Sequence, residues 1–266
     1  MILPSASPIG WTLAAAAAMA YAVPAAGASR LSAGTARTAL LLAWALHAAS
    51  LVWGLLGDTP PHFGFGPALS MTAWLVLTVY AVESQLFPQM QARWMLAGLG
   101  ALAVLLACVF PGQPLHVTAS PWLPLHLALG IASYGLFAAA AVHAVLMTHA
   151  ERQIRRAAAE YGGIPLLTLE RLTFRFVTAG FVLLTATLLA GWLFGETLYG
   201  RTMRWDHKTI FSVLAWLTFA ILLLGRSRFG WRGRNAVRVL YGGTTLLLLA
   251  YVGSRFVLEV MLGRSA

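Results

Sequence analysis

Long apolar stretches with almost no charged residues recur along the chain, and they limit its fold more than any other feature. Of the 266 residues, 59% are hydrophobic and 10% are charged, whereas about 25% of residues are charged in a typical soluble domain. A helix of about 20 apolar residues crosses the ~30 Å hydrocarbon core of a bilayer. The sequence therefore predicts an all-α polytopic membrane protein, with a single integral membrane domain over residues 1–266.

Eight such stretches, each of roughly 17 to 26 residues, predict about eight transmembrane helices. They cover Ile9–Ala26, Ala39–Leu56, Gly66–Phe87, Trp94–Phe110, Pro124–Thr148, Phe174–Phe194, Thr209–Leu224 and Leu240–Leu262. Residues 1–10 lack the positive charge of a secretory signal, so we interpret the first stretch as a transmembrane helix. Cys108 is the only cysteine, which excludes an internal disulfide and a Cys-x-x-Cys redox pair.

The basic residues indicate the orientation of these helices. They concentrate in alternate connections, above all around Arg152–Arg156 and Arg226–Arg238. Because connections rich in Lys and Arg stay in the cytoplasm, we expect these segments inside and both termini outward, in the periplasm. The formal charge of +10 then reflects topology. A nucleic-acid partner would need one basic face on a soluble domain, so we expect the lipid bilayer and no nucleic acid as a partner.

Topology also sorts the seven histidines by depth. His126 and His207 each begin an expected helix at the outward surface. His47 lies about 12 Å below the outer end of the second helix, where an ionisable side chain is costly enough to indicate function. A hydrogen-bonded structural histidine is the alternative at that position. The others are interpreted as surface, snorkelling or capping residues: His62, His116, His143 and His149.

His126 and His207 are candidate metal ligands because they share one depth. Two imidazoles that face each other across a gap suit the axial positions of a six-coordinate heme iron. Two unrelated interfacial histidines are the alternative. Asp206, next to His207, could accept the N–H of a ligating imidazole or pair with Lys208 or Arg204.

The residues around these histidines are aromatic and cationic. The aromatic group is Trp122, Tyr199 and Trp205, and the cations are Arg201, Arg204 and Lys208. Arg side chains pair bidentately with carboxylates such as the heme propionates. A flat aromatic shelf beside cations therefore suits a porphyrin. It would also suit other amphipathic anions, quinone head groups or lipid phosphates.

This part of the chain resembles a known family. Trp205–Thr209, followed by Leu214–Ala220, is similar to the end of the Trp-rich motif W-G-x-x-W-x-W-D-P-K-E-T-W of the cytochrome c assembly (CcsA/CcmC) heme-handling proteins, and to the helix after it. Gly230–Gly233 resembles the family's G-W-R-G. His126 matches its outward histidine at the head of an earlier helix. The resemblance covers about residues 122–262.

The motif of this chain departs from the family pattern at several positions. Tyr199 and the glycine after it keep the aromatic-glycine opening, but Met203 stands at the middle tryptophan. His207 stands at the proline that follows the aspartate. The family's second outward histidine, expected after the last span, is missing. These departures leave open an outward site in which His207 substitutes for it.

Two further positions concern histidines inside the membrane. Leu224 stands where the CcsA branch has one intramembrane histidine, and His47 is a candidate match for the other. Together these departures resemble the shorter HemX/YpjD-like inner-membrane branch more than a full cytochrome c synthetase component. They argue against covalent heme attachment and against channelling of heme across the membrane.

The resemblance implies a multi-pass protein of the bacterial inner membrane that binds heme b non-covalently at its outward face. His126 and His207 would be the axial ligands, and His47 a further intramembrane ligand. The role would be to handle, sense or deliver heme, with other cytochrome c assembly or membrane proteins as partners. No nucleophile–base constellation occurs, so we expect no catalytic residues and no enzyme. A small-solute or proton transporter using His47 and Glu83, and a membrane partner protein with an empty heme site, are the alternatives.

Overall fold

The computed structural model describes residues 8–27, 30–57, 62–86, 93–114, 122–155, 164–194, 206–257 and 261. Their long helices are α1 (Pro8–Ala26), α2 (Ala33–Leu56), α3 (Phe65–Leu86), α4 (Arg93–Val109), α5 (Leu123–Arg155), α6 (Leu166–Leu193), α8 (His207–Phe229) and α9 (Gly233–Leu248). The π-helical segment η2 (Leu249–Gly253) and the short α10 (Ser254–Phe256) continue α9. Two short strands, β1 (His62–Phe63) and β2 (Gln113–Pro114), form an antiparallel pair.

These helices confirm the all-α, multi-pass prediction. Each of the eight predicted spans falls on one helix, except that the last falls on α9 and the turns after it. Within the described residues, seven helices are long and apolar enough to cross a membrane, whereas α4 contributes a shorter apolar stretch, Met95–Val109. The number of crossings and the outward placement of both termini stay predictions.

Several helices are longer than the predicted spans. The α6 helix begins at Leu166, eight residues before the predicted start at Phe174, and α5 continues to Arg155 instead of Thr148. Hydropathy marks only the part of a helix that lies in hydrocarbon. A helix satisfies its own backbone hydrogen bonds, so it continues through the charged turns at the interface. The ion pair between Glu151 and Arg155, four residues apart, supports the extra turn of α5.

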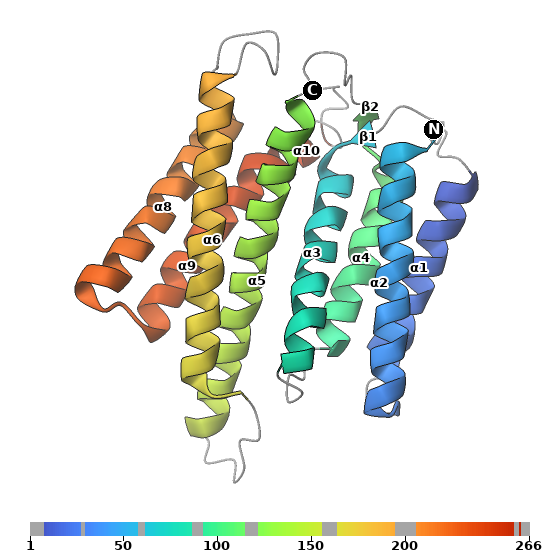
Figure 1. Cartoon of the computed structure of the whole chain (residues 1–266), viewed down its shortest axis with the longest axis horizontal. Helices are drawn as coiled ribbons and strands as arrows, with labels where there is room; N and C mark the ends of the chain where they lie inside the picture. The colour runs from blue at the N-terminus through green and yellow to red at the C-terminus, as the bar shows by residue number, and fades with distance from the viewer. Residues whose placement is uncertain are drawn as a thin grey trace. The chain divides into compact units, whose positions relative to one another are not determined.

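The helices form two compact units, and the predicted single domain over 1–266 stays a prediction. The first unit is Met1–His116 with Leu258–Ala266, and it contains α1 to α4. Successive helices in it run in alternating directions (Figure 1). Helix α1 packs on α2 and α4, and α4 packs on α3. Fully buried alanines such as Ala17, Ala43 and Ala97 line these contacts, because small side chains let membrane helices approach closely.

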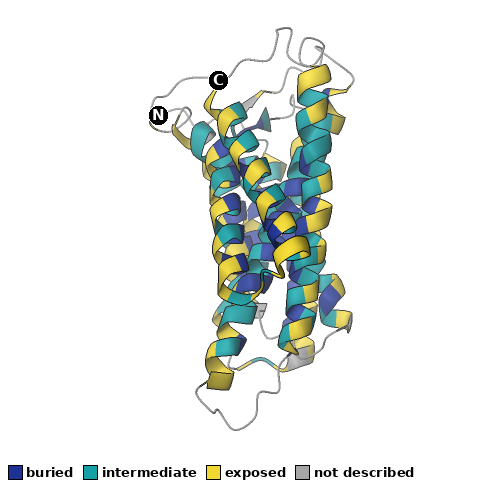
Figure 2. Ribbon diagram, turned by 90° about the vertical axis from the view of Figure 1, so that its left-hand side faces the viewer, coloured by how far each residue is buried: buried dark blue, intermediate teal, exposed yellow. Residues whose placement is uncertain are grey.

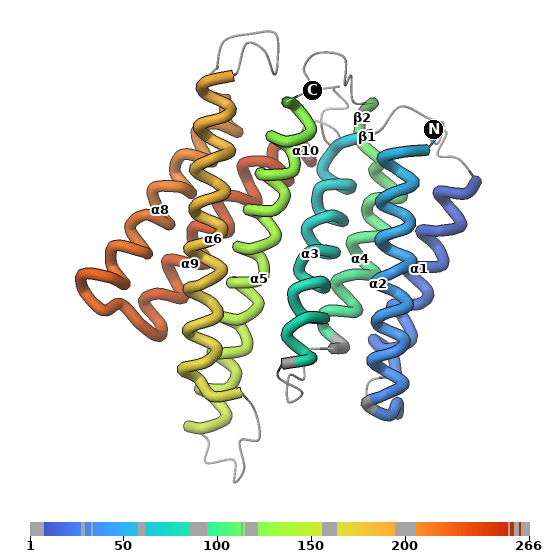
Figure 3. The backbone as a smooth tube through the Cα atoms, in the orientation of Figure 1, coloured from blue at the N-terminus to red at the C-terminus, as the bar shows by residue number. Residues whose placement is uncertain are grey.

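The second unit, Val117–Val257, contains α5, α6, α8, α9, η2 and α10. Its helices also alternate in direction, so that α5 and α8 begin, and α6 and α9 end, at the same end of the unit (Figure 3). Side-chain hydrogen bonds join neighbouring helices, as the alternative in hydrocarbon is an unsatisfied polar group. Ser133 Oγ donates to the Gly180 carbonyl at 3.1 Å, and Trp216 Nε1 donates to Thr185 Oγ1 at 2.8 Å.

Two stacked rings fill the middle of the second unit. Phe137 of α5 and Phe219 of α8 lie with ring centroids 3.7 Å apart and planes 10° apart. The edges of the two rings pack against glycines of the other two long helices. A Cβ on Gly180 of α6 would lie 3.2 Å from Phe137, and a Cβ on Gly243 of α9 would lie 2.7 Å from Phe219. We call Phe137, Phe219, Gly180 and Gly243 the aromatic layer, to which each long helix of the unit contributes one residue.

The outer surfaces of the helices are apolar, as expected of surfaces that face lipid. Figure 2 shows exposed residues along the outward sides of the helices and buried residues between them. On α8 the exposed face carries Leu214, Leu217, Ile221 and Leu224, between 43% and 58% exposed and three or four residues apart. A water-soluble protein rarely exposes so continuous an apolar strip. Leu224 therefore lies on the lipid-facing side of α8.

Candidate functional site

The candidate site lies where α5 and α8 begin, at one end of the second unit. Leu123 and Pro124 open α5, and His126 lies in its first turn. Asp206 is the N-cap of α8, with its carboxylate accepting the Thr209 backbone N–H at 2.9 Å. Such a cap satisfies one of the free N–H groups of the first turn, and a carboxylate there also complements the helix dipole. Asp206 thus fixes the start of the helix that carries His207 and Lys208.

Residues of two other helices, α6 and α8, lie beside His126. A Cβ placed on Gly191 of α6 would lie 3.5 Å from His126 Cε1, so the absence of a side chain at Gly191 leaves space beside the ring. Lys208 of α8 lies close enough for its charge to act on His126. Lys208 Nζ in turn lies 5.4 Å from the centroid of the Tyr251 ring. This is a cation–π arrangement, and it links α8 to η2.

Tyr251 is a residue of the site that the sequence analysis did not identify. It lies in η2, where the backbone widens from an α-helix to a π-helix. Such π-helical segments are rare and occur often at functional sites. Two residues before η2 begins, the Leu247 carbonyl of α9 accepts a hydrogen bond from Tyr134 Oη of α5 at 3.0 Å, which ties α5 to the last turn before the π-helical segment. Hydropathy gave no signal for this turn, because its residues are as apolar as the helix before it.

The remaining predicted site residues are either exposed or outside the described part of the chain. His207, the first residue of α8, is exposed, and Trp122, just before α5, is 60% exposed. The helices that carry His126 and His207, α5 and α8, begin at the same end of the unit (Figure 1). Four predicted residues lie outside the described residues: Tyr199, Arg201, Arg204 and Trp205. The axial pairing of His126 with His207 stays a prediction.

His47 belongs to the first unit, and it is fully buried. Its Nδ1 is hydrogen-bonded to Tyr21 Oη at 3.2 Å, and its Nε2 to Ser70 Oγ at 2.8 Å. Both ring nitrogens therefore have partners, which corresponds to the structural alternative for this histidine. A metal at either nitrogen would replace one of these bonds, and His47 as a ligand stays a prediction.

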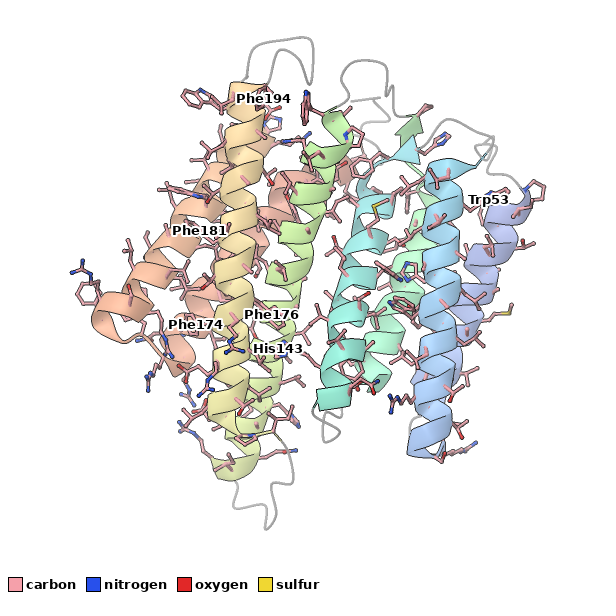
Figure 4. All side chains as sticks on the ribbon, viewed as in Figure 1. Trp53, His143, Phe174, Phe176, Phe181 and Phe194 are labelled. Carbon is pink, nitrogen blue, oxygen red and sulfur yellow. The ribbon has the colours of Figure 1, made fainter. Side chains whose placement is uncertain are left out.

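Other titratable residues pack against, or form hydrogen bonds with, nearby residues of the helices. His143, labelled in Figure 4, is buried against the Phe176 ring with centroids 5.2 Å apart, and its Nδ1 is bonded to the Ala139 carbonyl at 2.8 Å. His149 is hydrogen-bonded to Gln153 at 3.0 Å. Glu83, the other residue of the transporter alternative, is buried near the end of α3. Within the described residues, no group of three or more His, Cys, Asp or Glu side chains could hold a metal ion.

The long apolar helices and their exposed apolar surfaces define a multi-pass α-helical membrane protein. An imidazole, that of His126, lies in the first turn of one of these helices. A comparison with protein families matches residues 35–262 to the family described as cytochrome C assembly protein. The chain belongs to the cytochrome c assembly protein family, which confirms the resemblance drawn from the motif. The match begins near the start of α2, so it extends well before the residues from 122 onward that carry the motif.

Individual relatives agree with this assignment. The chain is 29% identical to Inner membrane protein YpjD of Escherichia coli over 224 residues, covering 82% of each chain. It is 36% identical over 147 residues to an uncharacterized 28.8 kDa protein of Azospirillum brasilense, covering 53% of this chain and 54% of the relative. It is 25% identical over 173 residues to Cytochrome c biogenesis protein CcsA of Synechococcus, covering 64% of this chain and 56% of the relative. No solved structure matches the chain.

Proposed function

We propose that this protein binds heme b non-covalently at the outward end of its second unit, and that it handles, senses or delivers heme in the bacterial inner membrane. The membrane assignment rests on the relative that is named an inner membrane protein. The heme assignment rests on the family and on a relative named for cytochrome c biogenesis. In this proposal the protein is not an enzyme, and its partners are the lipid bilayer, heme and other membrane or assembly proteins.

One observation carries the proposal, which is the cluster of His126, Lys208 and Tyr251 beside the side-chain-free Gly191. These residues fit heme chemically. A neutral imidazole is a common axial ligand of heme iron. A lysine beside it can pair with a propionate, and a bare glycine leaves space next to the imidazole ring. Bound heme would supply an iron centre for ligand or electron exchange.

The chain's own residues would position this group. Helix α5 carries His126 in its first turn, where the backbone N–H of His126 donates to the Trp122 carbonyl at 3.0 Å. Lys208 would provide the charge that selects a carboxylate, and Tyr251 would hold the lysine by its ring face. His207 would complete the coordination from the start of α8, in place of the family's second outward histidine.

Absorption spectra of the purified protein test both the cofactor and the ligands. The full chain is purified in mild detergent, with and without added heme, and reduced-minus-oxidised and pyridine hemochrome spectra are recorded. We expect a b-type Soret band in the wild type, its loss in His126→Ala, and a shifted or weakened band in His207→Ala.

The matched control is His149→Ala, which makes the same substitution at the other end of α5, where His149 is exposed and bonded only locally. The control should keep the full band. If no band forms after heme is added to the wild type, the heme proposal fails. A band that survives both ligand substitutions would instead show that the assigned ligands are wrong.

The transporter alternative predicts a different result. A proton or small-solute transporter would show flux in proteoliposomes that depends on His47 and Glu83, and it would need no heme band. A partner protein with an empty site would show neither flux nor a band. The same purified protein therefore distinguishes the three functions.

A further inference from the structure

A groove lined by arginines opens between α6 and α8 at the end of the second unit opposite His126. It has a volume of about 610 Å³, and its charged lining residues are Arg171, Arg175, Arg226, Arg232 and Glu170. Four cations against one carboxylate leave the groove strongly positive. The arginine distribution along the sequence predicts this end to be cytoplasmic.

Glu170 holds two of the four arginines in place. Its carboxylate forms an ion pair with Arg226 and lies 3.7 Å from Arg232 Nε. The guanidinium of Arg226 also lies over the Phe174 ring, 4.5 Å from its centroid, and donates to the Trp231 carbonyl at 3.3 Å. Phe174 lies in the lower half of α6 in Figure 4. These contacts fix the wall of the groove.

The other two arginines share one exposed face of α6. Arg171 and Arg175 are four residues apart, so their side chains lie on successive turns of the same face. Like charges at this spacing destabilise a helix, and an anion bound between them would remove that repulsion. Because Glu170 is already engaged by Arg226 and Arg232, Arg171 and Arg175 supply most of the excess positive charge of the groove.

Apolar side chains accompany the cations. Leu167, 69% exposed, Phe174 and Ala179 also line the groove. A positive site flanked by exposed apolar groups fits a ligand with an anionic head and hydrocarbon tails. A soluble anion or an acidic peptide would make no use of the apolar flank.

We propose that this groove binds the headgroup phosphate of an anionic glycerophospholipid from the adjacent leaflet. Arg171 and Arg175 contact the phosphate, since the planar guanidinium matches phosphate oxygens bidentately. Leu167 and Phe174 contact the glycerol and the upper acyl chains. Basic pockets between membrane helices on the cytoplasmic side are suited to such headgroups. The site is separate from the heme site and goes beyond the proposed function.

Lipid titration of the full-length protein tests the site. The protein in mild detergent is titrated with phosphatidylglycerol, phosphatidylcholine or inorganic phosphate, while its melting temperature and the lipids retained in native mass spectrometry are measured. We expect phosphatidylglycerol alone to stabilise and remain bound. In Arg171→Gln/Arg175→Gln its affinity should fall by roughly tenfold or more, since each basic side chain near an anionic headgroup contributes measurably to binding.

The control is Arg228→Gln/Arg238→Gln, which removes two exposed arginines outside the groove at the same end of the unit. It should keep wild-type affinity. Arg171→Lys/Arg175→Lys, which keeps the charge but loses the bidentate geometry, should give an intermediate affinity and shows whether the fold tolerates change at these positions. Equal losses in the control, equal binding of phosphatidylcholine, or an equal response to inorganic phosphate would each overturn the proposal.

Discussion

Lys208 extends from the first turn of α8 over the Tyr251 ring, and its charge acts on His126. If Lys208 pairs with a propionate, Lys208→Gln removes a charge-assisted hydrogen bond. We then expect roughly tenfold weaker heme binding. The reduction potential should also fall, because a positive charge near the iron favours the reduced state. Heme titration and a redox titration measure both effects.

Arg228→Gln is the control for Lys208→Gln, because it removes one exposed positive charge near the far end of the same helix. It should change neither quantity. Equal heme affinity in Lys208→Gln and wild type would remove Lys208 from the site, whatever the ligands of the iron.

Substitution of His47 should lower the stability of the protein and leave heme binding unchanged. His47→Gln disturbs two buried hydrogen bonds, to Tyr21 and to Ser70, and loss of a buried bond costs about 1–3 kcal/mol. We expect a lower melting temperature with unchanged heme content. Ser70→Ala, which removes only one of the two partners, should have the smaller effect. Loss of the Soret band in His47→Gln at full protein yield would instead make His47 a heme ligand.

The sequence predicted the site's residues unevenly, for a physical reason. Hydropathy gives the depth of a residue, which is why His126 and Lys208 could be expected at one level. It does not give the residue opposite on a neighbouring helix, so Gly191 and Tyr251 were missed. Asp206 had a recognisable signal, since an aspartate just before an apolar helix is a common N-cap. Its capping role was nevertheless not predicted.

At the scale of the element, two adjacent glycines of α9 provide a matched test of packing. A Cβ on Gly243 would lie 2.7 Å from the Phe219 ring, whereas a Cβ on Gly242 would have nothing within 4 Å. Gly243→Ala should therefore destabilise the protein by about 1–3 kcal/mol through overpacking. Gly242→Ala should be neutral or stabilising, by up to about 1 kcal/mol, since alanine favours the helix. Thermal unfolding in detergent compares the two.

Similar loss of stability in both variants would mean that Gly243 serves helix flexibility and not the approach of α8. A single sequence does not reveal such a contact between a glycine of one helix and a ring of the next. Glycine is expected at close helix contacts in membranes, but the sequence does not say which of two neighbouring glycines faces the partner helix. Helix positions were predictable because bilayer thickness sets their length. The π-helical end of α9 was not.

At the scale of the whole molecule, the orientation in the membrane is open to a direct test. Cys108 is the only cysteine, so Cys108→Ser gives a background for single introduced cysteines. Ser227→Cys, in the last turn of α8, should react with a membrane-impermeant maleimide only after the cells are opened. Pro114→Cys, exposed in β2, should react in intact spheroplasts. These results follow from the excess of arginines near residue 227.

The opposite labelling pattern would reverse the orientation. It would then place the His126 cluster on the cytoplasmic side. Labelling of both sites from the same side would point to an incorrect span count, and α4, the shorter apolar helix, is the first element to examine. Family membership was predictable from the motif, whereas the extent of the family match toward residue 35 was not, because the first helices carry no comparable motif.

The aromatic layer separates the two candidate binding sites of the second unit. The His126 cluster and the arginine groove both involve α6, through Gly191 and Arg175, which are about 24 Å apart along the helix axis. Between them lie the stacked rings and the glycines of the aromatic layer, which carry no charge. Substitutions that far apart and without shared partners usually add in free energy, so we expect the effects of changes at the two ends on stability to be additive.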